Sequence, residues 1–325
     1  EMFRRDWRVF LMTDARGRRY AEGFPAERIE DVSAASLSPN PITIVPSLFK
    51  IFKGINAAKK RFGELQPSLV AGFGGYPSFP ALMAARAKHV PILIHEQNSV
   101  LGRVNRAMAT SAQIVACGFE RLDRLPSNAH ARKHVVGNPV RSPILAVRQQ
   151  PYPEAPAGGA LNLLITGGSQ GARLFGEVIP EAIAMLPQAL RGRLKVVHQV
   201  REEQISAVRQ VYQQAQVDAE VAAFFTDMGQ RLGAAHLVIS RAGASSVTEL
   251  QVSGRPAILI PFAAAADDHQ TANAEGLTAV GAADVFSEAE FEPVALANLL
   301  ERRLADPHGL AVRAAAARAA AKPEA

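Results

Sequence analysis

One stretch near residue 240 has the pattern of an anion-binding turn. The apolar run of residues 236–239 indicates a buried parallel strand, which Gly243 ends before the small residues 244–246 begin a helix. Free backbone N–H groups and the helix dipole then face one point, where a phosphate can bind. Glu249 follows within the first turns, and its carboxylate can accept hydrogen bonds from a sugar diol. The alternative is an ordinary helix start that one of the two serines caps.

A second polar cluster, His95-Glu96-Gln97-Asn98, follows the apolar run of residues 91–94. Ligands bind at the carboxyl ends of strands in parallel sheets, so these side chains stand where chemistry is expected. Four successive hydrogen-bonding groups exceed what a loop requires, although one or two of them would cap the helix predicted over residues 99–109.

A glycine-rich turn, Gly167-Gly168-Ser169-Gln170-Gly171, follows the apolar run of residues 161–166. It lacks the Gly-Lys-Ser/Thr ending of a nucleoside triphosphatase loop and the full G-x-G-x-x-G fingerprint of dinucleotide-binding proteins. The next predicted strand ends in His198-Gln199, without the acidic residue that would bind an adenosine ribose. These features disfavour a nicotinamide enzyme and leave a loop that cradles phosphate.

The elements that position these groups are short apolar runs that alternate with helical segments along the chain. The alternation predicts an α/β protein with parallel sheets that helices cover on both faces. A Pro- and Gly-rich segment, residues 149–160, is the one clear linker, and it separates predicted domains 1–148 and 161–325. The strand predicted at residues 7–13 should follow a first strand and loop, so we expect the natural N-terminus to lie upstream. The helix predicted over residues 311–325 stops without a capping signal, so we expect a continuation there as well.

Composition narrows the classes of protein. The 325 residues are 48% hydrophobic, which is enough for two domains of ordinary size. A single cysteine, Cys117, excludes a disulfide framework and indicates a reducing compartment. No apolar run approaches the roughly 18 residues of a transmembrane helix. The net charge of +6 suits an acidic partner, whereas scattered arginines and only 6% aromatic residues disfavour nucleic acid.

The helix predicted over residues 47–62 combines apolar side chains with a basic flank. The apolar residues are Leu48, Phe49, Ile51, Phe52 and Ile55, and the flanking lysines are Lys50, Lys53, Lys59 and Lys60. Such a pattern is typical of a helix that lies in a membrane interface. The alternative is a core helix with a solvated basic face.

In their order along the chain, these motifs resemble those of the MurG family, the bacterial UDP-N-acetylglucosamine:lipid I N-acetylglucosaminyltransferases of peptidoglycan synthesis. The match covers nearly the whole chain, and its combination of motifs is highly specific. The matching stretches are Gly74-Gly75-Tyr76, His95-Glu96-Gln97-Asn98, Val136-Gly137-Asn138-Pro139-Val140-Arg141, Gly167-Gly168-Ser169-Gln170-Gly171-Ala172, Arg241-Ala242-Gly243-Ala244, Glu249, Asp268-His269-Gln270 and Asn273-Ala274.

The resemblance implies two Rossmann-like parallel-sheet domains that face each other across a cleft, the GT-B fold. It implies an inverting transfer of N-acetylglucosamine from UDP to the C4 hydroxyl of the muramyl residue of lipid I, without a metal or a cofactor. It also implies a peripheral enzyme on the cytoplasmic face of the bacterial inner membrane. That location favours membrane contact for the predicted helix at residues 47–62.

The resemblance further implies a role for each matching site residue. Contacts to the diphosphate are implied for Gly168, Ser169 and Gln170, and for the backbone N–H groups of Ala244, Ser245 and Ser246. Glu249 should hold the ribose hydroxyls. Phe225 should lie by the uracil through its backbone, and Arg241 should shape the base pocket. Gln270, with His269 beside it, should hydrogen-bond the sugar of UDP-N-acetylglucosamine. Asn98, from the first half of the chain, and Arg141, at the boundary of that half, should also reach this sugar nucleotide.

The chain departs from the family at its start. The family's N-terminal glycine-rich loop, with a histidine often proposed as general base, would precede Glu1. Because the acceptor hydroxyl needs a base, Glu96 becomes the first candidate and His95 the second, with a loop-fixing structural role as the alternative for each. We therefore expect weak donor binding and slow turnover from this chain.

Two other functions stay open on the sequence alone. One is a different lipid glycosyltransferase of the same fold, such as a diacylglycerol galactosyltransferase, although the motifs at residues 95–98 and at His269-Gln270 favour the peptidoglycan enzyme. The other is a non-catalytic module that binds a nucleotide sugar. A nicotinamide oxidoreductase is a distant third.

Overall fold

The computed structural model describes residues 5–34, 41–154, 158–168 and 171–324. Its internal contacts divide the chain into two units. The N-terminal unit comprises Glu1–Gly118 and Leu122–Val135, and the C-terminal unit comprises Phe119–Arg121 and Val136–Ala325. The division by contacts thus falls before residue 136, whereas the sequence placed the linker at residues 149–160. The reason is that helix α5 (Ser142–Arg148) buries Ile144 against the core of the C-terminal unit.

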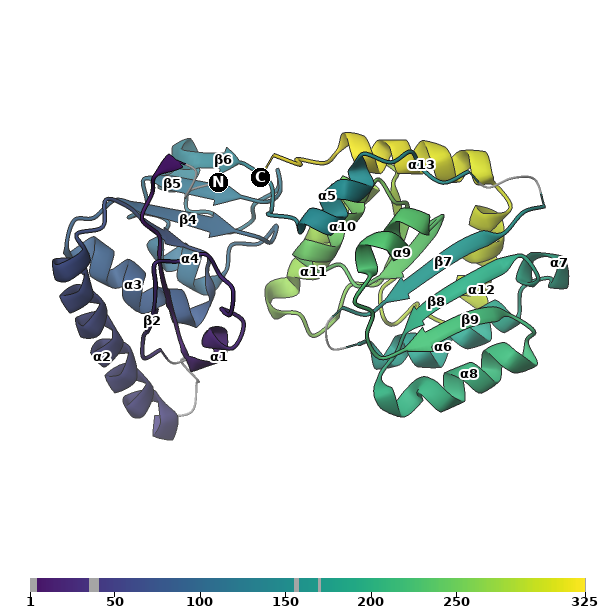
Figure 1. Cartoon of the computed structure of the whole chain (residues 1–325), viewed down its shortest axis with the longest axis horizontal. Helices are drawn as coiled ribbons and strands as arrows, with labels where there is room; N and C mark the ends of the chain where they lie inside the picture. The colour runs from purple at the N-terminus through teal and green to yellow at the C-terminus, as the bar shows by residue number, and fades with distance from the viewer. Residues whose placement is uncertain (1–4, 35–40, 155–157, 169–170, 325) are drawn as a thin grey trace. The chain divides into compact units, whose positions relative to one another are not determined.

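The N-terminal unit is built on a parallel sheet with the strand order β3-β4-β5-β6 (Figure 1). Apolar side chains of strands β4 and β5 and of the helices form its core, among them Ile94, Leu82, Met108 and Phe62. The strands are β3 (Val70–Gly72), β4 (Ile92–Glu96), β5 (Ile114–Cys117) and β6 (Lys133–Val135), and the helices are α2 (Pro41–Leu65), α3 (Gly75–Ala87), α4 (Arg103–Met108) and the 3-10 helix η2 (Ser127–Arg132).

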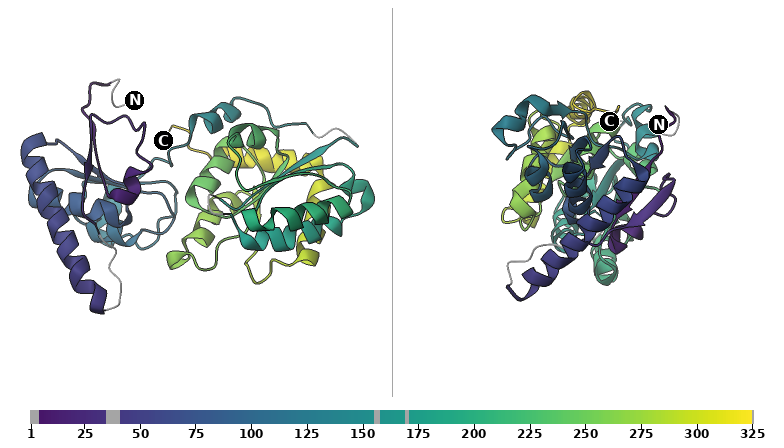
Figure 2. Two further views of the ribbon diagram at one scale, coloured as in Figure 1. Left: turned by 60° about the horizontal axis from the view of Figure 1, so that its bottom comes forward. Right: turned by 90° about the vertical axis from the view of Figure 1, so that its left-hand side faces the viewer.

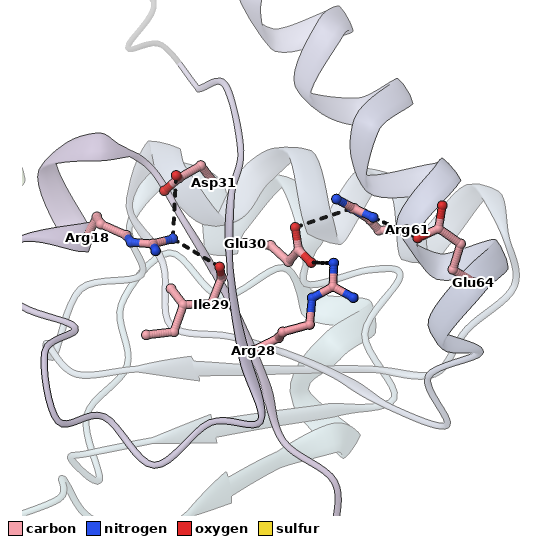
Figure 3. Close-up of polar contacts among 7 residues, drawn as sticks. All are labelled: Arg18, Arg28, Ile29, Glu30, Asp31, Arg61 and Glu64. Atoms are coloured by element: carbon pink, nitrogen blue, oxygen red, sulfur yellow. Dashed lines mark hydrogen bonds and ion pairs between the residues drawn. The ribbon is translucent and has the colours of Figure 1, made fainter.

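A separate two-stranded parallel sheet precedes this core. Strand β1 (Phe10–Thr13) pairs with β2 (Arg28–Asp31), and the short helix α1 (Ala15–Arg18) connects them. An ion pair joins this sheet to α2, because Glu30 contacts Arg61 at 3.3 Å (Figure 3). Within β2, Glu30 also contacts Arg28 at 2.7 Å. The sequence did not predict β2, whose polar segment becomes a strand only through its pairing with β1.

The C-terminal unit holds a six-stranded parallel sheet with the order β12-β11-β10-β7-β8-β9. Consecutive strands pair outward from its centre in two directions, which is the doubly wound arrangement that the sequence predicted. The strands are β7 (Leu161–Thr166), β8 (Leu194–Gln199), β9 (Asp218–Ala222), β10 (Leu237–Ser240), β11 (Ala257–Leu259) and β12 (Ala283–Val285).

Helices cover both faces of this sheet, and each face has its own apolar core. On one face the core includes side chains of α6, α8 and α12, and on the other it includes side chains of α5, α9, α10, α11 and α13. The helices not yet delimited are α6 (Arg173–Ala184), α7 (Gln188–Arg191), α8 (Ile205–Gln214), α9 (Met228–Ala234), α10 (Ala244–Ser253), α11 (His269–Thr278), α12 (Pro293–Leu304) and α13 (Pro307–Ala319), with the 3-10 helices η3 (Glu202–Gln204) and η4 (Ala266–Asp268).

Strand β9 covers only the first half of the apolar run of residues 221–224, since it spans Asp218–Ala222. Its register with β8 runs from Lys195 opposite Asp218 to Gln199 opposite Ala222, so the ladder ends where β8 ends. Phe224 consequently lies in the following loop with 66% of its surface exposed.

Candidate functional site

The N-terminus of α10 is open in the way that an anion site requires. Strand β10 is buried along its whole length and leads into this helix, with Gly243 as the N-cap. The first intrahelical bond runs from Val247 N to Gly243 O at 3.0 Å. The amides of residues 244–246 therefore have no intrahelical acceptor, and their N–H groups and the helix dipole favour an anion. Since no side chain caps the helix, the alternative in which a serine is the N-cap is wrong.

Helix α11 holds the turn before α10 in place. Gln270 Oε1 accepts hydrogen bonds from the backbone N–H of Ala242 at 3.2 Å and of Phe262 at 3.0 Å. Asn273 Nδ2 donates to the carbonyl of Ala242 at 3.2 Å. Gln270 and Asn273 lie three residues apart on one helix face, so together they fix both peptide groups of Ala242. The two bonds to Oε1 also orient the Gln270 amide and direct its Nε2 away from them.

Two predicted site residues, Arg141 and Glu249, meet in the C-terminal unit. Arg141 donates from Nε at 3.1 Å and from Nη2 at 2.9 Å, and both bonds go to Glu249 Oε1. The Arg141 side chain is 66% exposed and that of Glu249 is 18% exposed. Beside them, buried Asn138 donates to Thr248 Oγ1 at 3.0 Å. These contacts fasten residues 138–141 to α10, a link that the sequence motifs alone did not reveal.

Arg241 is held by several groups of the protein. Its guanidinium donates to the carbonyl of Ile260 at 3.1 Å and forms an ion pair of 2.6 Å with Glu288. The same group lies 5.0 Å from the ring centre of Phe175 and 5.4 Å from that of Phe262. Because Glu288 balances its charge, Arg241 is suited to shape a pocket rather than to bind an anion directly.

The Phe225 ring is buried beneath a second arginine. The Arg231 guanidinium lies 4.0 Å from the Phe225 ring centre, and it is paired with Glu220 at 2.6 Å and with Asp227 at 2.7 Å. Since the ring is buried, Phe225 would offer a ligand its backbone and not its aromatic face.

For the glycine turn after β7, the structure describes Gly167 and Gly168 at its start and Gly171 at its end. Gly168 has a φ of +80°, which favours glycine. Its carbonyl accepts hydrogen bonds from Gly171 N at 3.0 Å and from the side chain of Gln199 at 3.2 Å. The predicted contact residues Ser169 and Gln170 lie outside the described residues. Sequence reasoning missed Gln199, whose only signal was its place at the end of the second strand of a Rossmann unit.

His269 stands at the start of α11. Its Nδ1 lies 2.7 Å from the carbonyl of Ala266, so Nδ1 carries the proton and a neutral ring presents Nε2 as an acceptor. The two preceding residues, Asp267 and Asp268, have φ values of +57° and +52°, a conformation that side chains other than glycine seldom adopt. His269 and Gln270 thus follow directly after a tight turn.

In the N-terminal unit, Glu96 ends β4 with its carboxylate fully engaged. Oε1 accepts from Asn98 N at 3.1 Å and Asn98 Nδ2 at 3.3 Å, and Oε2 accepts from Gly102 N and Asn105 Nδ2, both at 2.9 Å. Glu96 is 3% exposed. Four N–H donors thus occupy its two oxygens. This geometry favours the loop-fixing alternative for Glu96 and accounts for the position of Asn98.

His95 is buried beside Glu96 on the same strand. Its Nδ1 accepts from Gln97 Nε2 at 3.1 Å, which places the proton of the neutral ring on Nε2. Its ring centre lies 5.8 Å from that of Phe73, in the loop after β3. The Nε2 atom therefore donates rather than accepts in the neutral ring, which favours a structural role for His95 as well.

Helix α2 packs against α3 in the N-terminal unit (Figure 2). Part of its predicted apolar set is exposed. Leu48, Phe49 and Phe52 are 51%, 69% and 63% exposed. Ile51 is buried and Ile55 half-buried, so these two belong to the inner side of the helix and not to an exposed patch. No helix in the described part of the chain is long and apolar enough to cross a membrane.

Both units are similar to known glycosyltransferase domains. The model of the glycosyltransferase family 28 N-terminal domain matches residues 1–117, and that of the family 28 C-terminal domain matches residues 162–325. The UDP-N-acetylglucosamine–N-acetylmuramyl-(pentapeptide) pyrophosphoryl-undecaprenol N-acetylglucosamine transferase of Maricaulis maris is 50% identical over 322 residues, which cover 99% of this chain and 88% of that protein. The transferase of the same name from Caulobacter vibrioides is 49% identical over 324 residues, or 99% and 89% of the two chains.

A solved structure extends this similarity to the fold. The crystal structure of Acinetobacter baumannii MurG matches with a TM-score of 0.82 and 30% identity. The match covers 100% of this chain and 90% of that one.

Proposed function

The chain belongs to the MurG family of glycosyltransferases, and from that membership we propose that it transfers N-acetylglucosamine from UDP-N-acetylglucosamine to lipid I. The acceptor atom is the C4 hydroxyl of the muramyl residue, the product is lipid II, and the transfer inverts the sugar's anomeric configuration. Among the structural observations, the open N-terminus of α10 with Glu249 one turn along carries the donor half of this proposal.

In the proposed donor site, the amides of Ala244, Ser245 and Ser246 bind the diphosphate. Negative charge develops on UDP as its bond to the sugar breaks, and preorganised N–H donors at a helix N-terminus stabilise it. A Cβ added at Gly243 would meet only Ser246 Oγ at 4.0 Å, so the space directly beside this residue is open. Loss of one such donor costs roughly 10²–10³ in rate in comparable sites.

The nucleoside and the sugar are assigned to the residues around this helix. Glu249 accepts hydrogen bonds from the ribose hydroxyls, and Arg141 adds a positive charge beside them. The backbone at Phe225 contacts the uracil, whose pocket Arg241 shapes. The oriented Gln270 amide donates through Nε2 to the sugar, and His269 accepts through Nε2. Gly168, with Ser169 and Gln170, completes the contacts to the diphosphate.

On the acceptor side, we assign His95, Glu96 and Asn98 to the end of β4 as groups that shape the loop and not as proton acceptors. The four bonds to the Glu96 carboxylate and the Gln97 contact to His95 support this role. Glu96 and His95 thus have a positional role in place of a catalytic one.

We further propose that the chain works at the cytoplasmic face of the inner membrane, through the exposed side of α2. Leu48, Phe49 and Phe52 supply the apolar surface, and Lys50 and Lys53 supply positive charge for anionic lipid. Lipid I is itself anchored in the membrane, so such contact would bring the enzyme to its acceptor.

A donor comparison tests the activity. Transfer of radiolabelled sugar is measured with a soluble lipid I analogue, using UDP-N-acetylglucosamine in one reaction and UDP-galactose in another. Transfer that requires the analogue and prefers the N-acetylated donor is expected. Sugar release that does not depend on the analogue, or a preference for UDP-galactose, would contradict the proposal.

A further inference from the structure

The side chain of Gln199 uses its entire amide to join three segments of the C-terminal unit. It is buried at the last position of β8. Its Oε1 accepts from Thr166 Oγ1 at 2.7 Å, and its Nε2 donates to Gly168 O at 3.2 Å and to Ala223 O at 3.1 Å. An amide has two N–H donors, so both are committed to these carbonyls and none is left for a ligand.

The three partners of Gln199 belong to the parts of the chain that the proposed donor site needs. Thr166 ends β7, directly before the glycine turn, and Gly168 lies within that turn. Ala223 begins the loop that leads from β9 to Phe225. In a dinucleotide-binding Rossmann unit, the residue at the end of the second strand binds the ligand's ribose through a carboxylate. Here an amide occupies that place and binds the protein's own loops.

We propose that Gln199 is a positioning residue for the donor, because it sets the spacing between the turn that contacts the diphosphate and the loop that contacts the base. The inference rests on the donor-site assignment made above. Gln199 touches neither the substrate nor the reacting atoms, and it acts through the backbone of Gly168 and Ala223.

The chemistry of the contacts requires an amide at this position. Both Nε2 partners are carbonyl oxygens, so a carboxylate of the same shape would face two acceptors without a donor. The Thr166 hydroxyl is fixed as well, since it donates to Gln199 Oε1 and accepts weakly from Gly168 N at 3.4 Å. Removing either partner leaves buried polar groups unsatisfied, and the two loops are then free to separate.

The test compares three variants of the full chain by calorimetric titration with UDP. Gln199→Glu removes the two N–H donors while keeping the side-chain shape, and it should weaken binding on the order of ten- to hundredfold at pH 8. Thr166→Val removes only the hydroxyl and should weaken binding about fivefold. This variant also tests the inference if Gln199→Glu does not fold.

Asn162→Ala is the matched control, because this amide also lies on β7 but donates to Ala234 O at 2.8 Å, near the strand's opposite end. Its affinity should stay within about twofold of the original.

A pH series separates positioning from simple loss of stability. Protonation of the carboxyl group that Gln199→Glu introduces restores one donor, so the ratio of the variant's UDP affinity to that of the original chain should recover as pH falls from about 8 to about 5.5. A cavity or a loss of folding would show no such recovery. Unchanged affinity for both Gln199→Glu and Thr166→Val would overturn the inference, and so would a loss in Gln199→Glu that is independent of pH and matched by Asn162→Ala.

A fourth variant separates the positioning role of Gln199 from the donor-site assignment on which it rests. Glu249→Ala should weaken UDP binding if the ribose assignment is right. If Glu249→Ala weakens binding and the Gln199 and Thr166 variants do not, only the positioning role of Gln199 is wrong. If the Gln199 and Thr166 variants weaken binding and Glu249→Ala does not, the positioning role stands and the ribose assignment is wrong.

Discussion

Arg141 donates two hydrogen bonds to a single carboxylate oxygen of Glu249, although the two residues are 108 positions apart in the chain. The pair joins the stretch after β6 to the helix whose N-terminus forms the proposed phosphate site. It also leaves Glu249 Oε2 without a bond to Arg141. A ribose can therefore bind Glu249 while Arg141 stays in place beside it.

Replacing Arg141 should affect the donor more than the fold. Arg141→Ala should weaken binding of UDP-N-acetylglucosamine about tenfold, because a positive charge next to the nucleotide is lost. The free energy of unfolding should change by less than about 1 kcal/mol, since the guanidinium is largely exposed and such ion pairs contribute little. Titration calorimetry and urea denaturation measure the two effects. An unchanged affinity would remove Arg141 from the donor site.

The role of Glu249 can be tested with a modified ligand. Glu249→Ala should weaken UDP binding by about ten- to hundredfold, since the ribose hydroxyls lose a charged acceptor. The original chain should bind 2′-deoxy-UDP more weakly than UDP, whereas Glu249→Ala should bind both nucleotides almost equally. If the variant still discriminates between the two nucleotides as the original chain does, another residue holds the ribose.

A Glu96→Gln substitution should act on stability. The four N–H donors around the carboxylate would then meet an amide with only one acceptor oxygen, so we expect the free energy of unfolding to fall by about 2–3 kcal/mol. The pH dependence of kcat should keep its shape, because no proton passes through Glu96. Chemical denaturation and a pH–rate profile check the two statements. Loss of the rise in rate on the acidic side of that profile, with normal stability, would restore Glu96 as the general base.

Two buried histidines predict how stability depends on pH. Burial lowers the pKa of His198 to about 3 from an ordinary 6.5, and burial also lowers the pKa of His236. Above pH 6.5 both are neutral in the folded and unfolded chains, and their contribution to stability is complete. Below that pH the unfolded chain takes up protons that the folded chain excludes. The free energy of unfolding should then fall by about 1.4 kcal/mol per pH unit for His198, down to about pH 3.

Urea denaturation at about pH 7.5, 6.5 and 5.5 measures this slope, and His198→Phe is the comparison. The variant loses the contact between His198 Nδ1 and Tyr212 Oη at 2.9 Å, so its stability at neutral pH will differ. The informative quantity is the change in the free energy of unfolding with pH below about pH 6.5. This free energy should fall less steeply with decreasing pH in the variant than in the original chain. Equal slopes would mean that His198 does not titrate on unfolding.

The exposed side of α2 predicts binding to anionic vesicles. Lys50→Glu with Lys53→Glu should weaken that binding by at least about tenfold, because each lysine near such a surface contributes about 1 kcal/mol. Phe49→Ser with Phe52→Ser should weaken it by removing apolar surface. Tyr20→Ser is the control, since Tyr20 is 90% exposed on the same unit but lies outside α2. Vesicle sedimentation at two salt concentrations measures all of these, and equal losses in the control would contradict a specific role for α2.

The features that the amino-acid sequence determined by itself are local ones. The run from β10 through Gly243 into α10 was predicted because an apolar strand, a break and a helix start follow one another within about 15 residues. The alternation of such units predicted two parallel α/β sheets. The order of the motifs indicated the family, which the relatives' identity over nearly the whole chain then established.

The tertiary structure decided every relationship between distant segments. The bond between Arg141 and Glu249 and the amide network of Gln199 join residues far apart in the sequence, and no local pattern encodes them. Burial likewise depends on packing, so only the folded chain separates Phe49 and Phe52, which are exposed, from buried Ile51. The Glu96 carboxylate is a further case: its residue type suggested a base, whereas the fold brings four N–H groups to its two oxygens, which favours a structural role.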